Sequence, residues 1–234
     1  MVPVEAQATL IGFSIKELMP YLSAAEKTTG AEFKAEESDG KIKVSVKGQS
    51  AHAAWPDTGI NGITSLLTLL ISLPLAESSS ARMLKEIAKL FPFGECDGTS
   101  AGIAMSDEVS GALSIALTVL ELKEDGVHLE ADCRAPVCAN DENVTEVLRE
   151  KLNKIGLTAG EKKMSPPHHT PENSPICKTL KKIYEEYTGK KGECIAIGGG
   201  TYVHNIEGGV GFGCNFPEDD CGAHGPDEHA FLDN

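Results

Sequence analysis

The spacing of hydrophobic and polar positions predicts short strands that alternate with amphipathic helices. Residues 3–12 form an apolar run that fits a strand leading into a turn. Ser14 then caps a helix whose apolar positions recur on one face, and Gly30 closes that helix. Between residues 31 and 48 the period changes to two, and a Ser-Asp-Gly turn at 38–40 divides this stretch. The pattern therefore predicts a strand, a helix and a hairpin.

A second series of helices and strands follows the hairpin. Apolar residues at helical spacing predict helices over residues 63–71 and 79–91. Strands over residues 112–122 and 127–134, joined by a Glu-Asp-Gly turn, then lead to a helix over residues 144–155. This strand, strand, helix order weakly repeats the preceding hairpin and helix. The pattern thus predicts an internal pseudo-repeat.

A Pro-rich segment at residues 165–167 is the best candidate for an internal boundary. Beyond it the pattern predicts a helix over residues 174–187, a short strand over residues 194–197 and loops rich in glycine. A part of this size does not easily bury a core of its own. We therefore expect it to pack against another element, such as the strand at residues 3–11.

Composition narrows the classes of function. The chain has 234 residues, of which 41% are hydrophobic, so it can bury a core as one large domain or two modest ones. Acidic residues outnumber basic ones, 35 against 21, and the net charge of -14 argues against a nucleic-acid partner. The sequence contains no apolar run of the roughly 20 residues that a membrane helix needs, and no pattern of a secretory signal peptide. We therefore expect a cytoplasmic location and no membrane partner.

The seven cysteines are an odd number and contain no C-x-x-C spacing. Neither a zinc knuckle nor a disulfide framework is indicated. We expect reduced thiols that are mostly buried.

His52 lies in an irregular segment just before a helix, between small residues that leave its imidazole reachable. A histidine in this position can donate a hydrogen bond to a developing oxyanion. The alternative is a histidine that fills a polar niche in a turn. Asn61, which follows, is interpreted as a helix cap.

Arg134 ends the predicted strand over residues 127–134 and shares one face of it with Asp132. The Asp132 carboxylate can hold the guanidinium for bidentate capture of a substrate carboxylate. The alternative is a solvated surface ion pair worth less than about 1 kcal/mol.

His224 is the strongest single metal candidate, because the sequence predicts that a tight Gly/Pro turn holds it close to Asp227 and Glu228. A catalytic zinc site needs about three protein ligands, and the chain contains neither H-E-x-x-H nor H-x-D. His204 and Glu207 have i, i+3 spacing, but two glycines follow them directly.

The glycine run before Thr201 allows a close backbone approach to a substrate. It is too short for a dinucleotide fingerprint. The alternative is a tight connection between a strand and a loop.

Taken together, three segments resemble the metal-dependent exopeptidase family that includes bacterial dipeptidases acting on Xaa-His and beta-alanyl dipeptides, carboxypeptidase G and aminoacylase. Residues 48–62 resemble the lid motif G-x-x-A-H-A-x-x-P-x-x-G-x-N, and residues 132–136 the D-x-R-x-P strand. Residues 198–228 resemble the G-G-G-T-Y segment and the A-H-x-P-D-E ending. The long-lidded dipeptidases are the most similar members.

The resemblance implies an α/β fold: a ferredoxin-like two-layer lid, of α+β type with an internal pseudo-repeat, joined to a C-terminal remnant of a zinc-exopeptidase catalytic domain. It divides the chain into a strand remnant at residues 1–12, a lid at residues 13–164 and a catalytic part at residues 165–234.

The same resemblance implies roles for single residues in a metallodipeptidase. His52 would stabilise the oxyanion, Arg134 would bind the carboxylate of a small dipeptide substrate, and His224 would ligate one of two zinc ions. Gly199, Gly200 and Thr201 would line the substrate pocket.

The segments that carry the other metal ligands in this family do not occur in the sequence. We therefore expect a fragment that is inactive alone. The long lid favours a monomer for the complete enzyme, whereas exposed apolar surface favours self-association of the fragment.

Two other interpretations are open. The chain could be a non-catalytic binding or interaction domain derived from a lid, in which His52 and Arg134 hold an acidic small molecule. It could also be a complete but divergent metal protein that uses His204, Glu207, His224 and Asp227.

Overall fold

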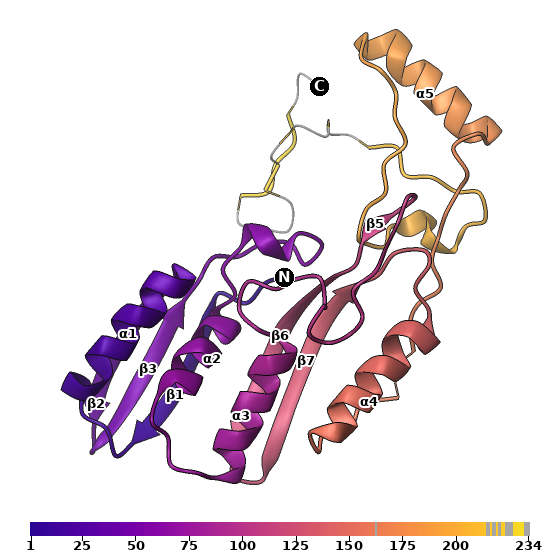
Figure 1. Cartoon of the computed structure of the whole chain (residues 1–234). Coiled ribbons are helices and arrows are strands. Elements are labelled where there is room, and N and C mark those ends of the chain that lie inside the picture. Colours follow the sequence, from indigo (N-terminus) through magenta and orange to yellow (C-terminus); the bar gives the residue numbers. More distant parts are fainter. Residues whose placement is uncertain (162, 214–215, 217–218, 220, 223–226, 232–234) are drawn as a thin grey trace. The chain divides into compact units, whose positions relative to one another are not determined.

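The structure, a computed structural model, describes residues 1–161, 163–213, 216, 219, 221–222 and 227–231. Two compact units, Met1–Ser165 and Pro166–Asn234, make up the chain, and each is described by itself. They divide within the Pro-rich segment. The described residues form five α-helices and small antiparallel sheets, in agreement with the predicted α+β class (Figure 1). The ferredoxin-like two-layer lid and its pseudo-repeat stay predictions.

A three-stranded antiparallel sheet opens the first unit, in the order β1 (Glu5–Ile11), β3 (Lys41–Lys47), β2 (Glu32–Ser38). The predicted hairpin is confirmed: β2 and β3 are joined at Asp39 and Gly40, whose φ values of 53° and 69° are those of a two-residue hairpin turn. Residues 1–12, expected to belong to a catalytic-domain remnant, lie in the first unit, where β1 pairs with β3 along its length. The roles of lid and catalytic part stay predictions.

Helix α1 (Ile15–Thr29) has both ends that the sequence predicts. The Ser14 hydroxyl accepts a hydrogen bond from the Glu17 N–H, and the Glu17 side chain accepts one from the Ser14 N–H, which completes a capping box. Gly30 ends the helix in the left-handed conformation, with φ of 70°. The helix is thereby fixed at both ends before its apolar face packs.

The remaining elements of the first unit begin with the short helix η1 (Pro56–Thr58). They continue with α2 (Gly62–Ser72), α3 (Ser79–Leu90), β4 (Ser106–Asp107), β5 (Gly111–Ala112), β6 (Ser114–Lys123), β7 (Gly126–Arg134), the π-helix η2 (Asp141–Thr145) and α4 (Glu146–Lys154). Strands β6 and β7 form an antiparallel pair.

The core of the first unit lies between the helices and one face of the strands. Figure 1 shows α1, α2 and α3 covering the same face. Leu18 of α1, Ile42 of β3 and Leu69 of α2 are fully buried and belong to one apolar cluster. The opposite face of β3 carries Lys43 and Lys47, which are exposed. An antiparallel sheet with one solvated face explains the alternation seen in the sequence.

The second unit contains α5 (Pro175–Thr188) and the short helix η3 (Tyr202–Asn205). The predicted strand at residues 194–197 is wrong, because an extended segment forms a strand only when another one pairs with it, and the structure pairs none there. Tyr187 and Ile195 are exposed to 87% and 69%, and of the residues described in this unit only three are buried. The expectation that this part buries little core of its own agrees with these exposures.

Within the described residues, no helix is both long enough and apolar enough to cross a membrane.

Two neighbouring positions of α1 should differ sharply in their effect on stability. Leu18→Ala removes a side chain that is fully buried in the core, and we expect it to lower the free energy of unfolding by about 2–5 kcal/mol. Met19→Ala, at a position that is 52% exposed, should change it by less than about 1 kcal/mol. Urea unfolding followed by circular dichroism measures both, and equal losses would contradict the assignment of the core face.

Candidate functional site

Residues 49–60, called here the His52 loop, form a ring that closes on itself. Gln49 and Ile60 make an isolated antiparallel bridge, in which each backbone N–H donates to the other residue's carbonyl at 2.9 Å. Just outside the bridge, the Gly48 N–H donates to the Val4 carbonyl at 2.7 Å, and the Gly62 N–H donates to the Pro3 carbonyl at 2.8 Å. The residues that flank the loop on both sides are therefore hydrogen-bonded to the segment that precedes β1.

Close backbone contact explains the glycines of this segment. A Cβ atom at Gly48 would lie 2.0 Å from the Ile60 carbonyl oxygen, and one at Gly59 would lie 2.8 Å from the Gln49 carbonyl oxygen. A Cβ atom at Gly62 would lie 2.6 Å from the Val4 carbonyl oxygen. All three contacts are with backbone, so a side chain cannot be accommodated by rotation. Only glycine permits the loop to close in this way.

Asn61 caps α2, as the sequence predicts, and also makes a contact that it does not predict. Its side-chain oxygen accepts hydrogen bonds from the N–H groups of Ile63 and Thr64 at 2.9 and 3.2 Å. Its amide nitrogen donates to the Leu117 carbonyl of β6 at 2.8 Å. One side chain thus fixes the start of α2 and attaches the loop to a strand 56 residues away.

His52 is half-buried, and its Nδ1 atom accepts a hydrogen bond from the Ala54 N–H at 3.2 Å. An Nδ1 atom that accepts has no proton, so the neutral imidazole carries its hydrogen on Nε2. The imidazole also lies beside the indole of Trp55, with ring centroids 5.4 Å apart. The loop therefore presents an Nε2–H donor next to an aromatic side chain that is 57% exposed.

The His52 loop lies against β6. The Ser114 hydroxyl donates to the Ala53 carbonyl at 3.2 Å, and Ala51 packs with Ala116 in a small apolar cluster. Across the strand pair, Ser114 is opposite Arg134 and Ala116 is opposite Asp132. Directly opposite residues share one face of a sheet. The loop and the Asp132–Arg134 pair therefore lie on the same side of β6 and β7.

Asp132 and Arg134 make a bidentate ion pair. Arg134 donates from Nε to Oδ1 at 2.6 Å and from Nη2 to Oδ2 at 2.8 Å, and the two side chains are 26% and 32% exposed. Partial burial alone would raise the pKa of Asp132, but the hydrogen bonds and charge of Arg134, with a smaller contribution from the charged N-terminus, bring it below its usual value. The carboxylate thereby fixes the orientation of the guanidinium.

Cys133 points to the other side of β7, where Ile115 lies opposite it and packs in the core. Burial, with the neighbouring charge of Asp132, raises the pKa of the Cys133 thiol to about 11. This cysteine is therefore a structural residue and not a nucleophile. Of the six cysteines in the described part of the chain, only Cys177 and Cys221 are buried, so the expectation of mostly buried thiols is wrong.

Asp107 ties the turn between β4 and β5 to the segment after Arg134. One carboxylate oxygen accepts from the N–H groups of Val109 and Ser110 and from the Ser110 hydroxyl, and the other accepts from the Cys138 N–H at 2.9 Å. These hydrogen bonds hold the pKa of Asp107 far below its ordinary value. The Ser110 hydroxyl also accepts from the Val137 N–H at 2.8 Å. The sequence does not predict this set of contacts, called here the Asp107 clamp, because its partners are 27 and 31 residues apart.

The remaining predicted site residues belong to the second unit. Gly199, Gly200 and Thr201 are exposed, and the Thr201 carbonyl accepts from the His204 N–H at 3.1 Å in η3. A Cβ atom at Gly200 would meet nothing within 4 Å. Unlike Gly48, this glycine is not required by the packing described around it.

His224 lies outside the described residues. The His204 Nε2 atom is 3.0 Å from the Pro166 carbonyl oxygen, and the His168 Nε2 atom is 2.8 Å from the Gly209 carbonyl oxygen. Within the part of the chain that the structure describes, no three His, Cys, Asp or Glu side chains gather as metal ligands. The alternative of a metal protein that uses His204, Glu207, His224 and Asp227 stays a prediction, because His224 lies outside the described residues.

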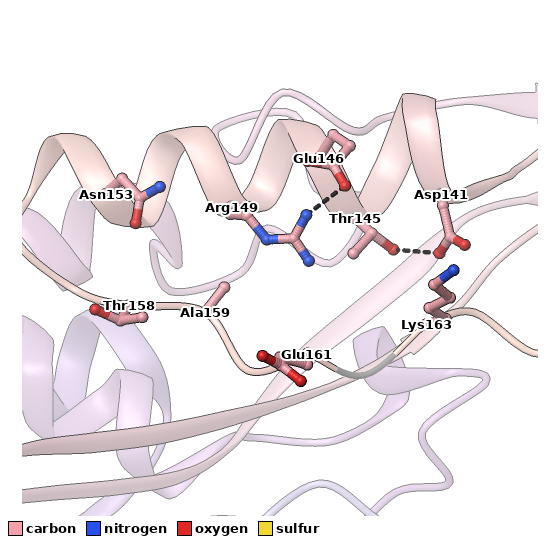
Figure 2. A pocket seen from close by; sticks show the side chains of 9 residues that line it. All are labelled: Asp141, Thr145, Glu146, Arg149, Asn153, Thr158, Ala159, Glu161 and Lys163. Carbon is pink, nitrogen blue, oxygen red and sulfur yellow. Dashed lines mark hydrogen bonds and ion pairs between the residues drawn. The ribbon is translucent and has the colours of Figure 1, made fainter.

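A cavity of about 650 Å³ lies between α4 and the segment at residues 158–163 (Figure 2). Polar groups that line it interact with one another. Arg149 pairs with Glu146, and the Asp141 carboxylate accepts a hydrogen bond from the Thr145 hydroxyl at 3.0 Å. Neither His52 nor Arg134 lines it. The cavity is thus separate from the candidate site.

Comparison with known proteins bears directly on this arrangement. No protein-family model matches the chain. It is 33% identical over its whole length to the "Putative dipeptidase YtjP" of Bacillus subtilis (strain 168), of which it covers 50%. The chain is similar to dipeptidases.

Two further relatives carry related names. The chain is 28% identical to a "Putative dipeptidase" of Staphylococcus epidermidis, over 81% of this chain and 40% of the relative. It is also 28% identical to the "Beta-Ala-Xaa dipeptidase" of Lactobacillus delbrueckii subsp. lactis, over 99% of this chain and 49% of the relative. These names support a dipeptidase family, and the chain spans about half the length of the relatives it matches.

The glycines of the His52 loop give a test of its closed geometry. Gly59→Ala should lower the free energy of unfolding by more than about 2 kcal/mol, because its Cβ atom would overlap the Gln49 backbone. It should also shift the fluorescence of Trp55, which is the single tryptophan of the chain. Gly160→Ala, where the space is open, should change stability by less than about 0.5 kcal/mol. Equal effects in urea unfolding would contradict the closed loop.

The Asp107 clamp should appear in the pH dependence of stability. Because the folded-state pKa lies below the unfolded value of about 4, the stabilisation is complete above that value and is lost as the pH falls towards the folded pKa. Asp107→Asn should therefore be less stable than the wild type at neutral pH, and the difference should narrow in acid. Urea midpoints across this range measure it. Asp125→Asn, in the exposed turn between β6 and β7, is the control and should show no such difference.

Proposed function

We propose that this chain supplies the lid and part of the active site of a metal-dependent dipeptidase. The observation that carries the proposal is the contact of the His52 loop with β6, directly across from Asp132 and Arg134. Two motifs that are about 80 residues apart in the sequence thus lie on one side of one strand pair. The similarity of the whole chain to proteins named dipeptidases supports the same conclusion.

In this proposal His52 stabilises the negative charge that develops on the carbonyl oxygen of the scissile bond. The hydrogen bond from Ala54 to Nδ1 supports this role, because it selects the tautomer that donates from Nε2. A donor held in advance towards the oxyanion lowers the barrier without reorganisation during the reaction.

Arg134 binds the carboxylate of the dipeptide. The bidentate contact with Asp132 supports the role, because it fixes the plane of the guanidinium before the substrate arrives. Planar, preorganised recognition of a carboxylate is the task for which arginine differs from lysine.

The proposed cofactor is zinc, two ions in the complete enzyme, with His224 as one ligand and the substrate pocket lined by Gly199, Gly200 and Thr201. Bound zinc would supply an activated water for hydrolysis. The described residues do not hold such an ion by themselves. We propose that the other ligands belong to the remainder of the enzyme.

The second unit supports an incomplete site of this kind. Its exposed apolar side chains, including Tyr187, Ile195 and Tyr202, are the surface of an element that needs a further partner. We propose that this partner is the remainder of the enzyme. The complete enzyme is then a monomer, and the chain alone self-associates.

A chimaera tests the proposal. The half of the Bacillus subtilis relative that lies outside the matched region is joined to this chain, and hydrolysis of beta-alanyl and Xaa-His dipeptides is measured with and without zinc. We expect zinc-dependent turnover by the chimaera and none by the chain alone. His52→Ala in the chimaera should lower kcat by about 10²–10³, and Arg134→Lys should act mainly by raising KM.

Two residues provide matched controls. His128→Ala removes an exposed histidine of β7, and Arg149→Lys changes an arginine of α4 that pairs with Glu146. Both variants should keep the activity of the parent chimaera. A folded chimaera without turnover, combined with dipeptide binding by the chain alone in calorimetry, would overturn the proposal in favour of a non-catalytic binding domain.

A further inference from the structure

Two free thiols lie beside each other in the second unit. Cys177 is in the first turn of α5, and Cys194 is in the segment that follows this helix. Cys177 is close enough to Cys194 to raise the pKa of its thiol. Cys177 is buried, with 5% of its surface exposed, whereas Cys194 is exposed to solvent. The pair therefore combines an accessible thiol with a protected one.

The backbone places these thiols together. A Cβ atom at Gly192 would lie 3.0 Å from the Cα, Cβ and carbonyl oxygen of Lys181, so the segment after α5 runs directly against the helix. The Gly192 N–H also donates to the Glu185 carboxylate at 3.0 Å. Cys177 precedes Lys181 by one helical turn, which is about 5.4 Å along the helix axis. Cys194 follows Gly192 by two residues, which is about 6.6 Å along an extended segment. Because the two distances from the contact are similar, the two cysteines come to lie beside each other.

Local contacts hold both segments in this register. Ser174 caps α5, and its hydroxyl accepts from the Cys177 N–H at 3.3 Å. Lys181 pairs with Glu172 on the N-terminal side of the helix, and Lys191 pairs with Glu193 in the following segment. A disulfide requires closely spaced backbones, and the contact of Gly192 with Lys181 provides such an approach two residues before Cys194.

We propose that Cys177 and Cys194 form an intramolecular disulfide when the protein meets a low-molecular-weight disulfide such as oxidised glutathione. The Cys194 thiolate attacks one glutathione sulfur, and a first glutathione thiolate leaves. The Cys177 sulfur, after losing its proton, then attacks Sγ of Cys194, and the second glutathione leaves. Two protein thiols are oxidised to one disulfide, and one glutathione disulfide is reduced to two thiols.

Exposure decides the order of the two steps, because the oxidant reaches Cys194 and not the buried Cys177. Local desolvation of its sulfur, the proximity of Cys177 and the charge of Glu172 raise the pKa of Cys194, while Lys181 opposes this. The thiolate is the nucleophile, so the reaction is expected to be faster at mildly alkaline pH.

The disulfide would enclose all of α5 except its first two residues in a ring. Four residues after Cys194 the chain enters the glycine run before Thr201. Oxidation would thus fix the start of that glycine-rich loop against α5, and reduction would release it. This inference does not depend on the proposed dipeptidase activity.

Peptide mapping of the full chain tests the proposal. The folded protein is incubated with oxidised glutathione at mildly alkaline pH, alkylated and digested with trypsin without reductant. We expect residues 164–178, which contain Cys177, to be joined to residues 192–234, with loss of two free thiols per chain. The second peptide also contains Cys214 and Cys221, so fragmentation of the joined peptides by mass spectrometry is used to identify which of its three cysteines is bonded to Cys177.

Variants separate this disulfide from other oxidation products. Cys138→Ser removes an exposed thiol of the first unit and should leave the joined peptides unchanged. Cys194→Ser should abolish them, and Cys177→Ser should leave Cys194 as a mixed disulfide with one glutathione. In urea the same oxidation should give mixed pairings. A folded wild-type protein that retains glutathione on Cys194, or that pairs Cys177 with Cys214 or Cys221, would overturn the proposal.

Discussion

The organisation of the first unit depends on one close contact between backbones. At the base of the His52 loop, two backbone segments approach so closely that a Cβ atom would not fit between them at Gly48 or at Gly59. The bridge between Gln49 and Ile60 closes the loop there, and Asn61 continues the contact to β6. The bridge fixes where the loop leaves and returns, and the side chains of Asn61 and Ser114 then attach the loop to β6, so His52 is positioned by the backbone first.

Electrostatic contacts complete what this geometry begins. Asp132, two residues before Arg134, fixes the orientation of its guanidinium. Asp107 holds the backbone of the segment that follows Arg134. In both aspartates the charged form accepts several hydrogen bonds, which is why their pKa values lie below the ordinary range. Each of these carboxylates is therefore a structural residue, and the candidate site is built from fixed donors and acceptors.

The two units differ in how far they are determined by their own contacts. The first buries a continuous apolar cluster under α1, α2 and α3, whereas the second leaves large apolar side chains exposed and is held by polar and backbone contacts around α5. This difference is consistent with a chain that spans about half the length of its relatives.

The sequence by itself determined the local structure. The capping box at Ser14, the hairpin turn at Asp39 and Gly40 and the cap at Asn61 were all predictable, because each depends on residues a few positions apart. Only the tertiary structure decided which segments meet: that Ser114 holds the His52 loop opposite Arg134, that Asp107 reaches Cys138, and that residues 194–197 find no strand to pair with. These contacts join residues far apart in the chain, and their geometry is set by packing, which no periodicity in the sequence records.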